Sequence, residues 1–235
     1  MAQIQQLQKE LRGMADEKKA KGLQRFFKTG KGEYAEGDKF LGVMVPQTRQ
    51  LVNKYWKEIS LAEVKSLLHS QFHEERLLAL LILVKKFEKG DEATRGKIFN
   101  LYLANTKYIN NWDLVDLSAP RIAGAYLVGR DRSILLKLAN SRNLWERRIA
   151  VLATFWFIAQ GESGFALKVA AILVHDEHDL IHKAVGWMLR EIGKRCRQAD
   201  EEEFLEKHYK IMPRTMLRYA IERFDNKRRY YYLCK

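Results

Sequence analysis

The chain has 235 residues, of which 47% are hydrophobic and 30% are charged, and its formal net charge is +13. This is the composition of a globular protein long enough for one large domain or two small ones, and it excludes a disordered chain. The 3 prolines and 14 glycines are too few for a β-sandwich or barrel, which needs turn residues about every ten positions, so we expect an all-α protein.

The excess of positive charge indicates a polyanionic partner, with nucleic acid as the first candidate and an anionic membrane surface as the second. Cys196 and Cys234 are the only cysteines, which excludes a disulfide framework and a C-x-x-C metal pair. The N-terminus lacks the apolar core of a signal peptide, and the apolar run 77–84 is too short to cross a bilayer. We therefore expect a soluble protein in a reducing, cytoplasmic setting.

In the first half of the chain, residues 3–28 have helical spacing, and the glycine-containing segment 28–39 is expected to be a surface loop. This segment lacks the spacing of a phosphate-binding loop. Further helices are predicted at 45–56, at 74–87 and from Asp91 to Leu103, and the one at 74–87 is apolar and expected to be central. Another is predicted to start at Ser60, where Glu63 completes a capping box.

The second half predicts helices at 120–128, 131–140, 143–159, 163–174, 178–195, 200–210 and 213–224. Helix pairs recurring about every 35–40 residues are typical of a HEAT or armadillo-like solenoid, a right-handed superhelix with a concave face that suits a long polyanion. The competing arrangement is a compact irregular helical domain, and the absence of strand signals favours the solenoid. We expect a single domain spanning 1–235, in which 1–38 form a variable helical region and a glycine-rich loop.

The most function-like stretch is 108–120, which places Trp112 before two carboxylates. Asp113 is predicted to cap a short helix. Asp116 follows Trp112 by four residues, so a helix through both would project them from one side.

Arg148 lies within an apolar helical stripe, where a cation needs an anion as partner. A structural ion pair and a phosphate group fit this position equally well. Trp187 lies at the flank of its helix's buried stripe, where it caps the packing or offers a surface to a sugar or base. Trp56, Trp145 and Trp156 are expected in the core.

The histidines lack the spacing of metal ligands, whether in the pair His69 and His73 or in the cluster His175, His178 and His182. We therefore expect no metal and no cofactor. Arg214 and Arg218, four residues apart on a helix that starts near Pro213, suit backbone phosphates. The complete set of expected DNA contacts is Arg147, Lys183, Arg190, Arg214 and Arg218.

Four ordered motifs give the chain a resemblance to a known family: 40–46 (FLGVMVP), 111–116 (NWDLVD), 144–148 (LWERR) and 183–191 (KAVGWMLRE). They resemble those of the HEAT-like-repeat DNA alkylation repair proteins, the AlkD-type alkylpurine DNA glycosylases. The resemblance runs from about residue 39 to residue 224. It implies a basic concave face that holds duplex DNA, and a monomer.

The resemblance also implies a catalytic site made of Asp116, Arg148, Trp112 and Trp187. Asp116 would stabilise a cationic sugar and position water, the tryptophans would pack on the deoxyribose, and Arg148 would hold the phosphate. The substrate would be double-stranded DNA containing purines alkylated at N3 or N7. Two departures are Asn111, where some members have a second aromatic residue, and the loop 30–39.

Two other functions compete with a glycosylase. One is a non-catalytic protein that binds damaged or branched DNA, and the other is a HEAT-type protein-interaction scaffold. Binding to DNA without base release would indicate the first, and absence of DNA affinity at moderate salt would indicate the second.

Overall fold

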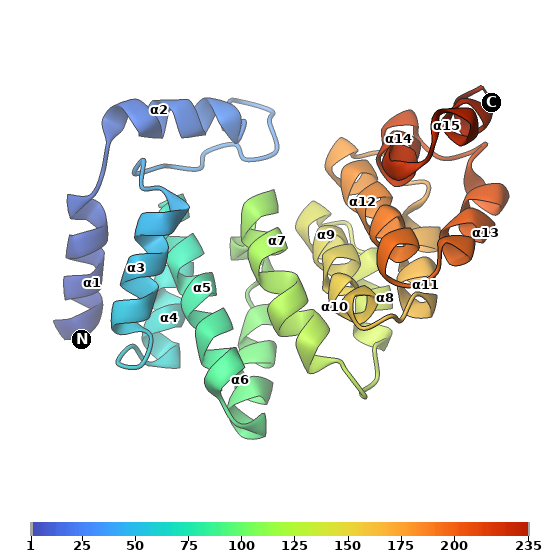
Figure 1. The fold of residues 1–235 in the computed structure, drawn as a ribbon. Coiled ribbons are helices and arrows are strands. Elements are labelled where there is room, and N and C mark those ends of the chain that lie inside the picture. Colours follow the sequence, from blue (N-terminus) through green and yellow to red (C-terminus); the bar gives the residue numbers. More distant parts are fainter. Residues whose placement is uncertain (1, 235) are drawn as a thin grey trace. The chain divides into compact units, whose positions relative to one another are not determined.

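A computed structural model describes residues 2–234, which form helices and, within that range, no strand (Figure 1). The prediction of an all-α protein is therefore confirmed. The chain divides into two compact units, Met1–Ser118 and Ala119–Lys235, which we call unit 1 and unit 2 and describe separately. Among the described residues, no helix has the length and apolar character needed to cross a membrane.

Unit 1 is built around one long helix, α5, against which α3, α4 and α6 pack. The helices of this unit, the last of which continues past its end, are α1 (Ala2–Gly13), α2 (Glu17–Phe26), α3 (Val45–Tyr55), α4 (Leu61–Leu68), α5 (His73–Lys89), α6 (Glu92–Leu103) and α7 (Trp112–Ala119). The capping box of Ser60 and Glu63 forms as predicted at the start of α4. The region 3–28, predicted as one helix, is two, because the chain turns at 14–16 and Asp16 caps α2.

The first turn of α5 carries four charged or titratable side chains that are at most 3% exposed: His73, Glu74, Glu75 and Arg76. Glu74 accepts hydrogen bonds from the backbone N–H groups of residues 41–43. Glu75 lies 2.7 Å from a guanidinium nitrogen of Arg12, on α1. A buried charge is costly unless it is paired, so these side chains fix the segments that they contact.

Unit 2 has a second long helix, α12, at its centre, with α9, α13 and α14 packed against it. After a π-helical turn at Pro120–Gly124, its helices are α8 (Ser133–Ala139), α9 (Leu144–Ala153), α10 (Phe155–Ala159), α11 (Gly164–Leu173), α12 (Asp179–Arg195), α13 (Gln198–His208), α14 (Arg214–Ala220) and α15 (Asn226–Leu233). Helix α15 was not predicted from the sequence.

The tryptophans expected in the core differ in burial. Trp145 is 7% exposed, as predicted, and Trp56 is half-buried. Trp156 is 36% exposed, so its assignment to the core is wrong. The predicted helix 143–159 breaks at Thr154, whose buried hydroxyl donates to the carbonyl of Val151. The spacing of apolar positions is therefore not continued from α9 into α10.

Gly42 is expected to tolerate no side chain. Its φ is +85°, and an added Cβ would lie 2.1 Å from the backbone oxygen of Asp16. We predict that Gly42→Ala lowers the free energy of unfolding by more than about 2 kcal/mol, measured by urea titration. The control is Gly22→Ala in α2, where nothing lies within 4 Å of an added Cβ, and it should raise stability by about 0.5–1 kcal/mol. Equal stability of the two variants would contradict the close approach of these segments.

Candidate functional site

Helix α7 starts at Trp112 and is capped by Asn111. The carbonyl of Asn111 accepts from the N–H of Val115 at 3.2 Å, and its side-chain oxygen accepts from the N–H of Trp112 at 2.8 Å. The N-cap position is therefore Asn111 and not Asp113 as predicted, although Oδ1 of Asp113 does accept from the first-turn N–H of Leu114 at 2.9 Å. Asp113 lies inside the first turn, and its Oδ2 lies 2.8 Å from Nε2 of His73.

Trp112 and Asp116 are one helical turn apart on α7 and share a face, as the sequence predicted for a helix through both. Both side chains are half-buried, so each retains access to solvent. Burial raises the pKa of the Tyr102 hydroxyl, a hydrogen bond with Ser118 opposes the rise, and the charge of Asp116 adds to it. The carboxylate of Asp116 therefore acts on the interior of unit 1 while remaining accessible.

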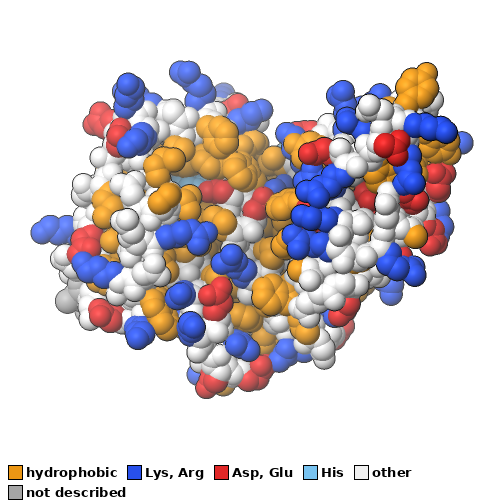
Figure 2. Space-filling model, viewed as in Figure 1, with side chains coloured by type: hydrophobic (Ala, Val, Ile, Leu, Met, Phe, Trp, Pro, Cys, Tyr) orange, Lys and Arg blue, Asp and Glu red, His pale blue; other side chains and the backbone are white. Residues whose placement is uncertain are grey.

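Aromatic rings gather around Trp112. The ring of Phe27 stacks on Trp112 with centroids 5.2 Å apart, and Phe26 meets Trp112 edge-on at 5.9 Å. Phe26 is 63% exposed, and Figure 2 shows hydrophobic side chains on the surface where α2 ends. The position before Trp112, where some family members have a second aromatic residue, is Asn111 here. Phe26 and Phe27, at the end of α2, place aromatic rings beside Trp112 instead. The signal for this contact was the pair of adjacent phenylalanines that closes the predicted helix 3–28.

A buried ionic cluster lies behind these rings. Nδ1 of His73 lies 3.4 Å from Oδ2 of Asp38, and the guanidinium of Arg76 lies 2.7 Å from Oδ1 of Asp38. Asp38 is 8% exposed, so the expectation of a plain surface loop at 28–39 is wrong for its last acidic residue.

Burial and charge act in opposite directions on this cluster. Burial alone would lower the pKa of His73, but the charge and hydrogen bond of Asp113 outweigh it, and the pKa rises to about 8. Burial alone would raise the pKa of Asp38, but the hydrogen bond from His73 and the charge of Arg76 hold it below its usual value. At neutral pH the imidazole is therefore a cation between two carboxylates.

The other two residues of the expected site lie in unit 2. Arg148 on α9 is 5% exposed, and its Nη1 donates to the carbonyl oxygen of Leu180, in the first turn of α12, at 2.6 Å. Trp187, further along α12, is half-buried, and its ring lies 6.0 Å from that of Phe155. Because α9 and α12 pack together, Arg148 and Trp187 stand on adjoining helices of one unit.

The five cations expected to contact DNA are all in unit 2, and four have partners within it. Arg147 pairs with Asp176 at 2.6 Å, and Lys183 pairs with Asp179 at 2.7 Å. Arg190 pairs with Glu222, and Arg214 donates to the carbonyl of Leu233 at 2.5 Å. Arg218 is exposed. Figure 2 shows Lys and Arg side chains gathered near α9 and α12.

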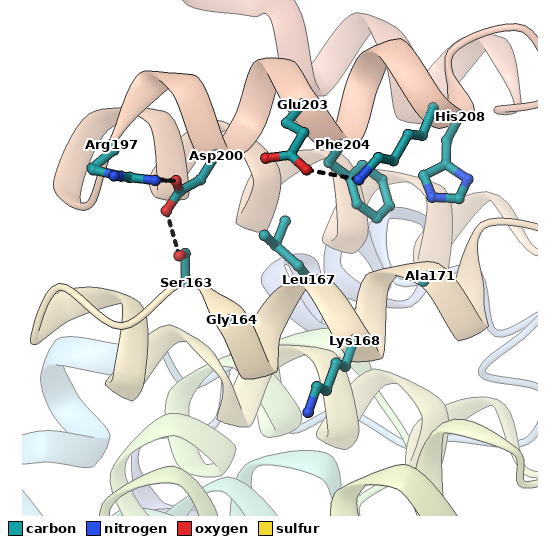
Figure 3. Close-up of a pocket in the computed structure, with 11 residues that line it drawn as sticks. Ser163, Gly164, Leu167, Lys168, Ala171, Arg197, Asp200, Glu203, Phe204 and His208 are labelled. Carbon is teal, nitrogen blue, oxygen red and sulfur yellow. Dashed lines mark hydrogen bonds and ion pairs between the residues drawn. The ribbon is translucent and has the colours of Figure 1, made fainter.

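A groove of about 480 Å³ lies between α11 and α13 (Figure 3). Its polar groups are engaged with one another. Asp200 accepts from Ser163 and pairs with Arg197 at 2.6 Å, and Glu203 pairs with Lys207 at 2.7 Å. The labelled side chain of Lys168 points away from α13. The hydrogen bond from Ser163 connects the start of α11 to α13, whereas both ion pairs lie within α13 and its N-cap. The groove presents no convergent catalytic group.

No group of His, Cys, Asp or Glu side chains with the arrangement of a metal site occurs in the described part of the chain. His69 instead pairs with Asn105, its Nε2 lying 2.7 Å from the amide oxygen.

The sequence profile of a family described as "DNA alkylation repair enzyme" matches residues 7–224. The chain belongs to this DNA alkylation repair enzyme family. The match takes in α2 and α1 from residue 7 onward, which the four motifs had left out, and DNA is the substrate that the family implies.

A solved structure described as a predicted DNA alkylation repair enzyme from Enterococcus faecalis has the same fold, with a TM-score of 0.70 at 16% identity. The similarity covers 91% of this chain and 98% of that one. A comparison with curated proteins found no match.

The buried cluster of unit 1 predicts a loss of stability at alkaline pH. The pKa of His73 rises from 6.5 to about 8 on folding, so its contribution is complete below pH 6.5 and is lost as pH rises through about 8. We expect the free energy of unfolding to fall by about 2 kcal/mol more in wild type than in His73→Gln between roughly pH 6 and pH 9.5. Urea titration of both proteins measures this, and parallel losses would contradict the assignment.

Proposed function

We propose that this protein is a monofunctional DNA glycosylase that releases positively charged purines alkylated at N3 or N7 from duplex DNA. One observation carries the proposal. In a member of the DNA alkylation repair enzyme family, α7 presents a tryptophan and a carboxylate, Trp112 and Asp116, on one accessible helix face. An anion beside an aromatic surface suits a reaction whose transition state is a cationic sugar.

The substrate itself supplies part of the catalysis. A purine alkylated at N3 or N7 is already cationic, so it leaves without being protonated by the enzyme. The remaining task is to stabilise the oxocarbenium-like deoxyribose and to deliver water to C1′. We assign both roles to Asp116, whose half-buried position weakens the screening of its charge by solvent.

The other roles follow from the local contacts of each residue. Trp112 is held by the ring of Phe27 and leaves part of its own ring accessible for the deoxyribose. Trp187 offers a second such surface in unit 2. Arg148, whose Nη1 is fixed by the Leu180 carbonyl, would hold the phosphate of the damaged nucleotide. We propose that the four residues act on the same nucleotide.

We further propose that both units belong to one HEAT-like-repeat domain spanning residues 1–235, a right-handed superhelix with a basic concave face for the duplex. Each unit has a long central helix with other helices packed against it, which supports a stacked-repeat architecture. The excess of cations supplies the attraction for a phosphate backbone.

Replacement of the catalytic carboxylate tests the proposal directly. We expect wild type to release 3-methyladenine or 7-methylguanine from methylated duplex DNA, with the base detected by chromatography. Asp116→Asn should lower the single-turnover rate about 10²–10³-fold, since it removes a preorganised charge from the transition state. Glu203→Gln, the same chemical change at an exposed ion pair with Lys207, should leave the rate unchanged.

Release no faster than the spontaneous rate, or an Asp116→Asn variant as active as wild type, would disprove the catalytic assignment. Tight binding without release would instead indicate a protein that recognises damaged or branched DNA.

The salt dependence of binding tests the DNA contact expected at Arg218. Because each phosphate neutralised contributes about 0.9 to the slope of log Kd against log salt, Arg218→Ala should lower the slope by about that amount. Fluorescence anisotropy with a labelled duplex measures it. Arg197→Ala removes an arginine already paired with Asp200, and its slope should equal that of wild type. An unchanged slope in the Arg218 variant would exclude this contact.

A further inference from the structure

We infer that His73 is a positioning residue that fixes Trp112, through two separate contacts that meet at the first turn of α7. The inference rests on the proposed function only for the role of Trp112 in catalysis. His73 lies on α5 and is 2% exposed, so it does not itself meet the substrate.

The first contact is a series of neighbouring aromatic rings. The imidazole of His73 stacks on Phe40 with centroids 4.5 Å apart and an interplanar angle of 19°. It also lies 5.1 Å from the ring of Phe27, and Phe27 stacks on Trp112 at 5.2 Å. Aromatic pairs at these separations attract one another, and a protonated imidazole adds a cation facing the phenyl rings. A shift of the imidazole is therefore transmitted to the indole through Phe27.

The second contact is the hydrogen bond to the neighbour of Trp112. Nε2 of His73 lies 2.8 Å from Oδ2 of Asp113, which is the next residue on α7. The route from Trp112 through Phe27, His73 and Asp113 returns along the backbone to Trp112. We call this closed series of contacts the His73 circuit. It restrains Trp112 twice: Phe27 packs on the face of the indole, and the His73–Asp113 hydrogen bond fixes the neighbouring residue of the backbone.

The protonation state of His73 determines how many of its hydrogen bonds to carboxylates can form. The charged groups that face the imidazole are Asp113 from α7, Asp38 from the loop before α3, and Arg76 from α5 itself. A protonated imidazole donates from both nitrogens and therefore satisfies both carboxylates. A neutral imidazole has one N–H, so deprotonation leaves one carboxylate facing a lone pair in a buried site.

Deprotonation should therefore loosen Trp112 without unfolding the unit. The pKa of about 8 places this change above neutral pH, so the rings are fixed at neutral pH and relax in alkali. Placement errors of an ångström at a reacting centre reduce rates by up to about 10²-fold, and a ring that loses one of two restraints should cost about three- to tenfold.

The test measures single-turnover base release and DNA affinity from about pH 6 to about pH 9.5, a range that spans the expected change in charge. With 3-methyladenine as the lesion, the wild-type rate should fall about three- to tenfold with a midpoint near pH 8. His73→Gln should be slow at every pH and lack the midpoint, while its affinity for DNA changes less than about twofold.

Asp113→Asn interrupts the same circuit from the other side. If both residues act through one contact, the double variant should be no slower than the slower single variant. Multiplied losses, or a loss of DNA affinity equal to the loss of rate, would overturn the inference in favour of a general structural role.

Fluorescence of Trp112 gives a readout that needs no substrate. The difference between the emission of wild type and that of Trp112→Phe should titrate with a midpoint near pH 8, and this midpoint should be absent in His73→Gln. This midpoint is read without His73→Gln, so it does not depend on whether that variant folds. Emission that stays constant across the range overturns the inference. If the emission titrates but no base is released, the positioning role stands and the proposed glycosylase function fails.

Discussion

The burial of four consecutive polar side chains at the start of α5 is the constraint on which unit 1 depends. A buried charge without a partner costs several kcal/mol, so each of these residues requires a specific segment to be in place. Glu75 requires α1, Glu74 requires the backbone of residues 41–43, and Arg76 requires Asp38. His73 requires α7. One helical turn therefore specifies how four distant segments meet, in a way that apolar contacts alone would not.

This constraint also explains why the accessible face of α7 is well defined. An eight-residue helix has little stability of its own, and its direction depends on what holds its first turn. Here Asn111 satisfies backbone groups at the helix start, and Asp113 attaches the turn to the core. The orientation of the half-buried residues Trp112 and Asp116 is therefore set by the buried residues Asn111 and Asp113. In unit 2 the link between Arg148 and the Leu180 carbonyl similarly joins α9 to the first turn of α12.

Local sequence signals predicted what local interactions determine. The helical class, the capping box at Ser60 and the shared face of Trp112 and Asp116 all depend on residues within a few positions of one another. The buried cluster joins residues separated by 35 and 40 positions, and no local pattern reveals such a pairing. The glycines of 28–39 placed Asp38 in a surface loop, and the position of Asp113 at a helix start gave it a capping role. The exposure of Trp156 was also missed. The apolar pattern in the sequence continues through Thr154, but the helix breaks there, so the pattern assigned Trp156 to the wrong face.

Helix α2 is expected to have a lower local stability than the other helices of unit 1. None of its ten residues is buried. It meets the rest of unit 1 through the Asp16 N–H bond to Leu41, the close approach of Gly42, the edge of Phe26 on Trp112, and the ring of Phe27, which follows the helix. A segment with so little buried apolar surface opens at a free energy well below that of global unfolding, and its amide hydrogens exchange early. Phe26 belongs to this segment, whereas Trp112 belongs to α7, whose first turn is bonded to buried His73 through Asp113. The aromatic surface around Trp112 therefore combines a fixed half with a half that can withdraw while the core stays folded.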